Sequence, residues 1–494
     1  MVRPPRLFIL IGFLIGIVLP ITAGSLVTDT RAGAANRLAA FDPAEALPGG
    51  TATSRKTFDT NAFSHASANM PFEKELDFKI GNGFFKRIWV SAPSSTTAAD
   101  GLGPLYNAKS CQRCHLKDGR GHPPAANYPD DNAVSMFLRL SIPPQNDADR
   151  DRLKTRNVIG EPTYGEQLQD FSVQGVPSEG RMHIDYETFD VKLVDGETVS
   201  LLRPSYKIVD LQYGPLHPET MLSPRIAPQM IGLGLLELVP ETDILALADP
   251  DDTDGDGISG KPNHVWDITE GRLRLGRFGW KAGSPGIEQQ SQSAFNGDIG
   301  ISTRLFPAAS GECTANEKAC LDAPSGASPH YENLEAHGTI TDLVVFYSRN
   351  LAVPQRRDAD DAVVLRGKQI FTDIGCASCH NPTFTTGPSA NMPWLSRQTI
   401  WPYTDMLLHD MGDGLADNRP EAQADGREWR TPPLWGIGLT GTVNGHTRYL
   451  HDGRARSVLE AILWHGGEAR ASRDAAAGLT KDDRNALLKF VESL

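Results

Sequence analysis

The sequence predicts a mainly helical protein made of two related halves, the first of which is enlarged by a small β insertion. Three observations support this fold class. The pentapeptide C-x-x-C-H occurs twice, at residues 111–115 and 376–380. Apolar residues recur at helical spacing beside the second copy and near the C-terminus, whereas residues 182–201 alternate as in strands. One motif shared by two halves indicates duplication of a small helical unit.

Composition excludes several classes of protein. The chain has 494 residues, a formal net charge of −13 and 39% hydrophobic residues. This is neither a disordered chain nor a polytopic membrane protein. A nucleic-acid binder would show a basic face, and no basic run is present. Six cysteines are too few for a disulfide scaffold, so their spacing carries the information.

The N-terminus has the pattern of a secretory signal peptide, which we assign to residues 1–23. Arg3 and Arg6 precede an apolar run at 7–19, and Ile21-Thr22-Ala23 forms a small-residue cleavage site. We therefore expect export to the periplasm and no stable membrane span after cleavage. An uncleaved N-terminal anchor is the alternative. Residues 24–70, rich in Ala, Ser, Thr and Gly, are expected to form a loosely structured lead-in.

The first domain is expected over residues 71–353. Met182, Ile184 and Tyr186 alternate with polar residues, and Asp195-Gly196 is a hairpin turn signal, so this region predicts the β insertion. A helix follows near the end of the domain, on a face formed by Ile340, Leu343, Val344 and Tyr347.

The polar stretch that begins at Pro354 marks the predicted boundary, and residues 354–494 form the second domain. A helix over about 363–371 leads to the second motif. Ser457-x-x-Glu460 and Thr480-x-x-Asp483 are capping boxes that predict two C-terminal helices.

The C-x-x-C-H spacing is that of c-type haem attachment. Each thiol bonds one vinyl group, and the adjacent histidine ligates the iron from below. The motifs therefore predict two covalently bound haem c groups, held by Cys111, Cys114, Cys376 and Cys379, with His115 and His380 as iron ligands. A redox dithiol needs no following histidine, and a zinc site would need four converging ligands. The predicted halves are thus two cytochrome c-like haem domains.

The ligand on the other side of each iron decides between electron transfer and chemistry, because an open position can bind peroxide. For the second haem, His465 ends the apolar face of the helix after Ser457 and is the preferred candidate. The competing ligands are His409, Met406 and Met411. The first haem has no clear sixth ligand. His183, His217 and Met230 are possible, whereas His122 follows His115 by only seven residues, too near to fold over the opposite face.

Two further features are local. Cys313 and Cys320 lie in a polar loop, where an oxidising compartment favours a disulfide over two free thiols. Asp252, Asp254 and Asp256 stand at positions 1, 3 and 5 of a calcium-like loop with Gly at position 6. Position 12 is Asn263 instead of Glu, so we expect a Ca²⁺ site unlike an EF-hand. The alternative is a solvated acidic turn.

Two segments resemble a known superfamily. Arg430-Thr-Pro, followed by Tyr449-x-His451-Asp-Gly-Arg-Ala and a helix, is similar to the C-terminal haem domain of bacterial di-haem cytochrome c peroxidases and of the related methylamine dehydrogenase maturation enzyme. In that superfamily the position of His465 holds Met or Tyr, so a His there implies a bis-His haem of lower potential. Over most of residues 75–494 the chain resembles the di-haem oxidoreductases described as putative peroxidases and sometimes labelled thiol-oxidoreductase-like.

The second resembling segment holds three candidate catalytic residues. Arg277-Phe-Gly-Trp280, then Gln290, then Asp298-Ile-Gly follow the superfamily order. The resemblance implies that Trp280 relays electrons between the haems and that Gln290 and Asp298 line the open face of the first haem. Asp298 replaces a Glu and stands two residues closer to the tryptophan than the superfamily pattern has it.

The resemblance implies a peroxidase-like oxidoreductase. Electrons would pass from a redox partner, such as a small cytochrome, through the second haem to an open first haem. Two other functions stay open. One is a non-catalytic electron-transfer protein that serves a periplasmic partner, for example in metal uptake. The other is a maturation oxidase that acts on a protein substrate at long range.

Overall fold

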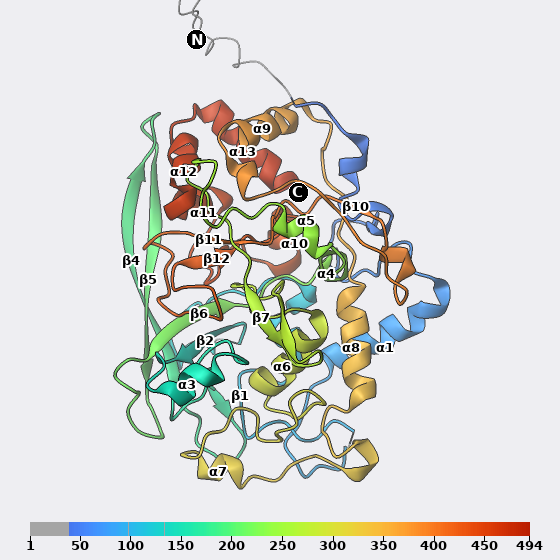
Figure 1. Cartoon of the computed structure of the whole chain (residues 1–494), viewed down its shortest axis with the longest axis vertical. Helices are drawn as coiled ribbons and strands as arrows, with labels where there is room; N and C mark the ends of the chain where they lie inside the picture. The colour runs from blue at the N-terminus through green and yellow to red at the C-terminus, as the bar shows by residue number, and fades with distance from the viewer. Residues whose placement is uncertain (1–38, 97, 133) are drawn as a thin grey trace, which may run out of the picture. The chain divides into compact units, whose positions relative to one another are not determined.

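The computed structural model describes residues 39–96, 98–132 and 134–494 (Figure 1). The predicted signal peptide, residues 1–23, and the first part of the predicted lead-in lie outside the described residues. Among the described helices, none has the length and apolar content that a membrane crossing requires.

The fold is mixed α and β, which corrects the expectation of a mainly helical protein. The α-helices of the described residues are α1 (Glu75–Lys86), α2 (Cys111–Cys114), α3 (Asp147–Arg152), α4 (Leu233–Glu237), α5 (Glu241–Leu245), α6 (Ile287–Ile299), α7 (Lys318–Leu321), α8 (Gly338–Arg349), α9 (Ala362–Asp373), α10 (Thr440–Asn444), α11 (Val458–Trp464), α12 (Arg470–Ala477) and α13 (Lys481–Ser493). The strands are β1 (Leu105–Tyr106), β2 (Met136–Ser141), β3 (Phe171–Ser172), β4 (Arg181–Lys192), β5 (Thr198–Val209), β6 (Met221–Ile226), β7 (His264–Asp267), β8 (Arg272–Leu275), β9 (Phe384–Thr385), β10 (Thr399–Ile400), β11 (Leu408–Asp410) and β12 (Glu428–Arg430). These strands pair two by two into small antiparallel sheets: β1–β3, β2–β6, β4–β5, β7–β8, β9–β10 and β11–β12.

The predicted helices form where the apolar spacing and the capping boxes place them. Helices α8 and α9 match the two predicted before and after the boundary. At the start of α11 the Ser457 hydroxyl accepts a hydrogen bond from the Glu460 N–H at 3.1 Å. At the start of α13 the Thr480 hydroxyl accepts one from the Asp483 N–H at 3.3 Å. Both predicted helices and their N-caps are therefore confirmed, and each cap satisfies an N–H group that a helix start leaves unpaired. The Glu460 carboxylate accepts from Arg456 and the Asp483 carboxylate from Arg366, so the reciprocal half of each capping box does not form.

Two helix pairs repeat one arrangement, and each lies beside a C-x-x-C-H motif. Helix α1 crosses α8 at Gly81, where a Cβ would lie 2.2 Å from the Leu343 carbonyl oxygen. Helix α9 crosses α13 at Gly367, where a Cβ would lie 1.9 Å from the Ala486 carbonyl oxygen. Only glycine permits backbones to approach so closely. Both halves therefore depend on the same close helix crossing.

An aromatic ring one turn after each glycine packs near the motif histidine. The ring centroid of Phe85 lies 6.2 Å from that of His115, and Phe371 lies 6.1 Å from His380. The spacing G-x-x-x-F thus occurs in both halves, on the helix that precedes the motif. This repetition agrees with the predicted duplication of a small helical unit.

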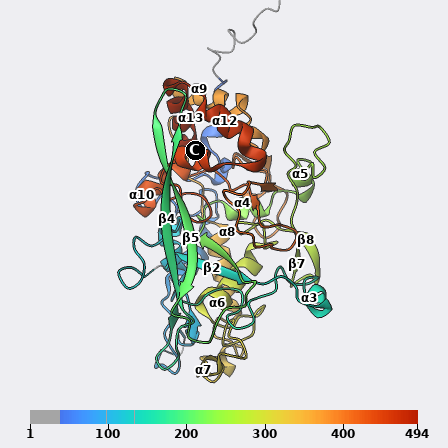
Figure 2. The ribbon, with the colours of Figure 1, turned by 90° about the vertical axis from the view of Figure 1, so that its left-hand side faces the viewer.

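The predicted β insertion is confirmed as a long hairpin. Strand β4 pairs with β5 from Arg181↔Val209 to Lys192↔Thr198, around the predicted turn. The hairpin runs along one side of the body, from beside β2 and β6 to beside α11 and α12 (Figures 1 and 2). At its tip, Arg484 of α13 donates to Asp195 at 2.7 Å and to Glu197 at 2.6 Å. An element of the first half therefore packs on helices of the second.

The described part of the lead-in is well packed, contrary to the expectation of a loosely structured segment. Glu45 is 3% exposed and forms an ion pair with Arg356 at 2.6 Å. Its carboxylate also accepts hydrogen bonds from Lys368 and from the Tyr403 hydroxyl. A buried carboxylate with three partners anchors this segment to the second half, because each partner offsets part of its desolvation.

The two predicted domains interlock, and the described residues form one compact unit. Lys281, in the first half, is fully buried and bonds the Asp417 carboxylate of the second half at 2.8 Å. Its other two hydrogen bonds go to the carbonyl oxygens of Arg419 and Asp425. Asp417 also accepts from Ser223 and lies 3.8 Å from Arg225. The domain boundary at residue 354 stays a prediction, because the described residues on its two sides belong to the same compact unit.

Replacing Lys281 with Met should destabilise the protein by about 3–5 kcal/mol, because it leaves the buried Asp417 carboxylate without its closest cation. Urea denaturation followed by circular dichroism measures the change. Lys154→Met removes an exposed ion pair with Asp151 and serves as the control, with no change of midpoint expected. Equal midpoints for the two variants would contradict the inferred role of Lys281.

Candidate functional site

The first C-x-x-C-H motif forms a short helix, α2, with His115 directly after it. The His115 Nδ1 lies 2.8 Å from the carbonyl oxygen of Pro228, more than 100 residues away. A carbonyl only accepts, so Nδ1 carries the proton and Nε2 keeps its lone pair. Burial lowers the pKa of His115 to about 4, so the ring is neutral at pH 7. A neutral imidazole with a free Nε2 is the form that ligates iron.

A cavity of about 920 Å³ opens at this motif and is lined by Cys111, Cys114 and His115. Its volume is within the range of cofactor pockets, and both thiols are free. Arg120 also lines it, buried, with its guanidinium 5.7 Å from the centre of the Trp280 ring. Its Nε has no hydrogen-bond partner among the described residues, and burial lowers its pKa to about 10. Haem, whose carboxylates would pair with such an unbalanced cation, fits these residues.

The second motif repeats this geometry. The His380 Nδ1 lies 3.0 Å from the Tyr403 carbonyl oxygen, and the His465 Nδ1 lies 2.7 Å from the Ala461 carbonyl oxygen. Both rings therefore keep Nε2 free. Burial lowers the pKa of His380 to about 4, and His465 contributes to the lowering, so the two rings are within electrostatic range. These contacts fit an iron held between His380 and His465.

His409 is unsuitable as the competing ligand, because both of its ring nitrogens have carboxylate partners. Nε2 lies 2.7 Å from Asp405 and Nδ1 lies 2.7 Å from Glu468. Burial alone would lower the pKa of His409, but these hydrogen bonds hold it well above its usual value. Met406 is buried in a core cluster that includes neither cysteine of the motif. Met411 packs beside the core around the motif and stays an alternative ligand.

Of the candidate sixth ligands of the first haem, only Met230 lines the cavity. It comes two residues after Pro228, the residue whose carbonyl holds His115. His122 bonds its neighbouring Pro123 carbonyl, His183 bonds Asp185, and the His217 Nδ1 accepts from a backbone N–H two residues away. The three histidines are therefore absent from the cavity wall.

The three predicted catalytic residues all line the first cavity. Trp280 is buried and donates its Nε1–H to the Ile226 carbonyl at 2.9 Å. It also belongs to the large apolar core against which Cys376 of the second motif packs. Asp298 accepts a hydrogen bond from the Gln167 amide at 2.9 Å, and burial raises its pKa. The three residues predicted from sequence order thus line the same cavity.

The segment around His451, which supports the family resemblance, joins the halves of the structure. The His451 ring stacks on Trp429 with centroids 3.8 Å apart. Asp452 accepts from the Tyr206 hydroxyl of β5 at 2.9 Å and from Arg454 at 2.8 Å. The segment therefore ties the hairpin to the second half.

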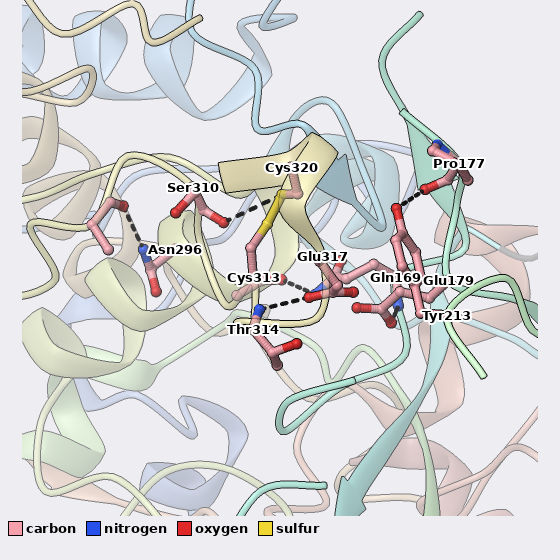
Figure 3. Close-up of a disulfide and its surroundings, with 12 residues drawn as sticks. Gln169, Pro177, Glu179, Tyr213, Asn296, Ser310, Cys313, Thr314, Glu317 and Cys320 are labelled. Carbon is pink, nitrogen blue, oxygen red and sulfur yellow. Dashed lines mark hydrogen bonds between the residues drawn. A yellow bond between two sulfur atoms is a disulfide. The ribbon is translucent and has the colours of Figure 1, made fainter. Parts of the chain in front are cut away.

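Sequence reasoning missed a carboxyl on the cavity wall, that of Glu312. The only signal was its place beside Cys313, which forms the predicted disulfide with Cys320 (Figure 3). Burial raises the pKa of Glu312 to about 7, and the charge of Glu166 adds to the effect. Arg120 was also missed, and nothing in the sequence distinguishes it from other arginines.

A carboxyl pair anchors the loop that bears this disulfide (Figure 3). Glu179 and Glu317 are both buried, and the negative charge of Glu317 acts on Glu179. Glu179 also accepts from the Gln169 N–H at 2.5 Å, and Glu317 accepts from the Thr314 N–H at 2.6 Å. Burial, with the neighbouring charge of Glu317, raises the pKa of Glu179 well above its usual value. The folded state therefore binds a proton at this pair more tightly than the unfolded chain does.

The acidic loop brings together a different set of carboxylates from the one predicted. Oxygens of Asp249, Asp252 and Asp254 lie within 4.8 Å of one another, and Asp256 is outside this group. The Asp256 carboxylate accepts instead from the Ile258 N–H at 2.8 Å. The fold of the loop therefore groups Asp249, and not Asp256, with Asp252 and Asp254.

The proton bound at the Glu179–Glu317 pair predicts a loss of stability with rising pH. The unfolded chain releases the Glu179 proton near its ordinary pKa of 4.5, whereas the folded state keeps it to higher pH. The pair's contribution is complete below that pH and is lost as pH rises through the folded pKa. We expect Glu179→Gln to unfold at a higher temperature than wild type at pH 9 and to show a smaller decline from pH 6. Glu75→Gln, at an exposed site on α1, should follow the wild-type curve. Parallel curves for E179Q and wild type would contradict this account.

Comparison with known proteins agrees with the haem-binding geometry. A family model described as "Di-haem oxidoreductase, putative peroxidase" matches residues 41–494. None of the curated proteins compared with the chain matches it. Among solved structures it is similar to Kuenenia stuttgartiensis hydrazine synthase pressurized with 20 bar xenon, at 17% identity and a TM-score of 0.22, over 41% of this chain and 70% of that chain. Such a TM-score supports no argument. The family model spans nearly the whole chain and confirms the resemblance seen in the motifs: the protein belongs to the di-haem oxidoreductase, putative peroxidase family, whose cofactors are haem groups.

Proposed function

We propose that this protein is an exported di-haem c-type oxidoreductase that reduces peroxide. The observation that carries the proposal is the first cavity, which a neutral motif histidine and buried acids line together. Family membership supports a di-haem redox function. Reduction of peroxide needs both a redox centre and a group that moves protons, and this cavity offers residues for each.

The chain's own residues have separate tasks in this proposal. Haem bound at the first motif would supply electron exchange with peroxide. Cys111 and Cys114 would hold it covalently, His115 would ligate it through Nε2, and Arg120 would pair with its carboxylates. Gln290, which lines the same cavity, is suited to orient a small polar substrate, because its amide can both donate and accept.

The second motif would receive electrons from a redox partner protein. His380 and His465 would saturate its iron, which suits electron transfer because no position is left for substrate. Trp280 would carry electrons onward, since its ring borders the cavity and the core beside Cys376. In the same proposal residues 1–23 direct export, and Asp249, Asp252 and Asp254 hold a structural Ca²⁺.

One observation favours the alternative of a non-catalytic electron-transfer protein. Met230 lines the first cavity, and a thioether is a sufficient sixth ligand to saturate a haem iron. Both irons would then be six-coordinate, and the protein would only pass electrons between partners.

Covalent attachment predicts a mass increase of two haem groups on the denatured, purified protein. Cys111→Ala with Cys114→Ala should remove one haem and leave the other, and the equivalent double variant at Cys376 and Cys379 should do the same. Mass spectrometry and the pyridine haemochrome spectrum measure both effects. Cys313→Ala, outside the motifs, is the control and should keep both haems. Loss of haem on denaturation of the wild type would contradict the prediction.

Electron paramagnetic resonance separates the two functions. The peroxidase predicts a high-spin ferric signal together with peroxide turnover. The signal should stand beside a low-spin one in the oxidised protein, or come from the single haem that stays ferric after one-electron reduction. Only low-spin ferric signals in both states, without turnover, would reject it. Trp280→Phe should slow steady-state turnover, because a phenyl ring is harder to oxidise than the indole ring that relays electrons. The haem content should stay unchanged. The matched control is Trp394→Phe. The Trp394 ring lies away from the cavity and donates its Nε1–H to the Asn350 side chain.

A further inference from the structure

Glu312 is a carboxyl on the cavity wall that the family pattern does not predict. The loop that carries it reaches the cavity from a segment after α6, at Ser310-Gly-Glu-Cys. The backbone of Gly311 has φ +58°, and a Cβ there would lie 2.9 Å from the Asn296 carbonyl oxygen. Only glycine permits this turn at this distance. The turn brings the Glu312 side chain onto α6.

The contacts of Glu312 place its carboxylate over the face of α6 that bears Gln290. Its Oε2 accepts a hydrogen bond from the Glu166 N–H at 3.2 Å. Its Oε1 lies over Gly297, where an added Cβ would be only 3.1 Å away. Gly297 is seven residues after Gln290, which is two helical turns along the same face. Because position 297 has no side chain, the Glu312 carboxylate fills the space above it.

Asp298, the residue that the resemblance favours, is less free to move a proton. Its carboxylate accepts from the Gln167 amide at 2.9 Å, and that same amide bonds the Asn107 side chain. The Asp298 carbonyl accepts the N–H groups of Asn107 and Ala108. The backbone carbonyl of Asp298 and one oxygen of its carboxylate therefore help to hold the segment before the first motif.

The charges around Glu312 suit a group that gains and loses a proton near neutrality. Burial is the largest influence on its pKa, the carboxylates of Glu166 and Asp298 add to the rise, and Arg139 opposes it. The Glu166 carboxylate lies 3.7 Å from the Arg156 guanidinium, and both of these side chains are more exposed than that of Glu312. The result is a pKa of about 7, whereas a free glutamate would be fully ionised at neutral pH.

We propose that Glu312, and not Asp298, is the carboxyl that moves the proton when peroxide is reduced in the first cavity; this inference rests on the proposed function. The Glu312 carboxylate takes a proton from one oxygen of hydrogen peroxide and gives it to the other. The O–O bond then breaks, and the second oxygen leaves as water. Over the whole reaction H₂O₂, two protons and two electrons give two molecules of water. Solvent supplies the protons, and the one-electron donor protein supplies the electrons.

The disulfide and the Glu179–Glu317 carboxyl pair hold the loop that carries Glu312. Cys313 directly follows Glu312 and is bonded to Cys320 of α7. Thr314 donates its hydroxyl to the Thr163 carbonyl at 2.6 Å, which ties the loop to the segment that leads to Glu166. The loop is therefore held directly after the carboxyl that it presents.

The test compares Glu312→Gln, Asp298→Asn and Glu166→Gln in the haem-loaded protein, with two readouts. Infrared spectroscopy over pH 5–9 follows the protonated carboxyl band, independently of turnover. Stopped-flow absorption follows association of hydrogen cyanide, which gives up its proton on binding, and the single-turnover reaction with peroxide. We expect E312Q to lose the carboxyl that titrates near pH 7 and to slow both reactions, the peroxide reaction by about 10²–10⁴-fold. E166Q should keep the Glu312 carboxyl band and lower the pH midpoint of its titration, because the like charge of Glu166 is removed.

The outcomes separate this inference from the proposed function. Wild-type peroxide rates in E312Q, with the loss in D298N, would overturn the role of Glu312 and leave peroxide reduction standing. If the wild type binds neither cyanide nor peroxide in either redox state, the proposed function fails, and the inference that rests on it fails too; the infrared titration then still shows whether Glu312 ionises near pH 7. Should E312Q not fold, Glu312→Asp keeps a carboxyl one methylene shorter and should react at an intermediate rate. A wild-type rate in E312D together with an unchanged band in the infrared titration would reject the proposal.

Discussion

The orientation of each motif histidine depends on one hydrogen bond, from its Nδ1 to a backbone carbonyl far along the chain. The Pro228 carbonyl holds His115 and the Tyr403 carbonyl holds His380. Each bond fixes the tautomer as well as the ring, because a carbonyl can only accept. The segments that supply these carbonyls must therefore be placed correctly before either pentapeptide can hold haem.

Buried charge is the second theme of the structure. Lys281 with Asp417 joins the halves, and Glu45 with its three partners joins the lead-in to Tyr403, whose carbonyl orients the second histidine. Arg120, in contrast, is buried beside the first motif with no ion pair to a carboxylate among the described residues, and its Nε has no hydrogen-bond partner there. Glu45 and Asp417 thus have cations beside them, whereas Arg120 lines a cavity in which a cofactor with carboxylates fits. That contrast is a physical mark of the site, since a buried unpaired charge is costly.

Local elements were predictable because their determinants lie within a few residues. The N-caps at Ser457 and Thr480, the β4–β5 hairpin and the disulfide between Cys313 and Cys320 all formed where the sequence predicts them. The fold is mixed instead of mainly helical, and the described part of the lead-in is packed instead of loose, for a common reason. Short paired strands and buried loops depend on partners hundreds of residues away, as Glu45 depends on Arg356. Periodicity cannot report such partners.

The sequence by itself determined the chemistry that this protein can hold: two C-x-x-C-H pentapeptides, and with them membership of a di-haem family. It also identified Trp280, Gln290 and Asp298, because their order follows a known pattern. Only the tertiary structure decided which side chains share a cavity. In the folded chain both ring nitrogens of His409 lie beside carboxylates, and the Asp298 carboxylate accepts a hydrogen bond from Gln167. The fold also brings Glu312 from a separate loop onto α6. Ligand and acid–base roles depend on unpaired atoms and on burial, and both are properties of the packed chain.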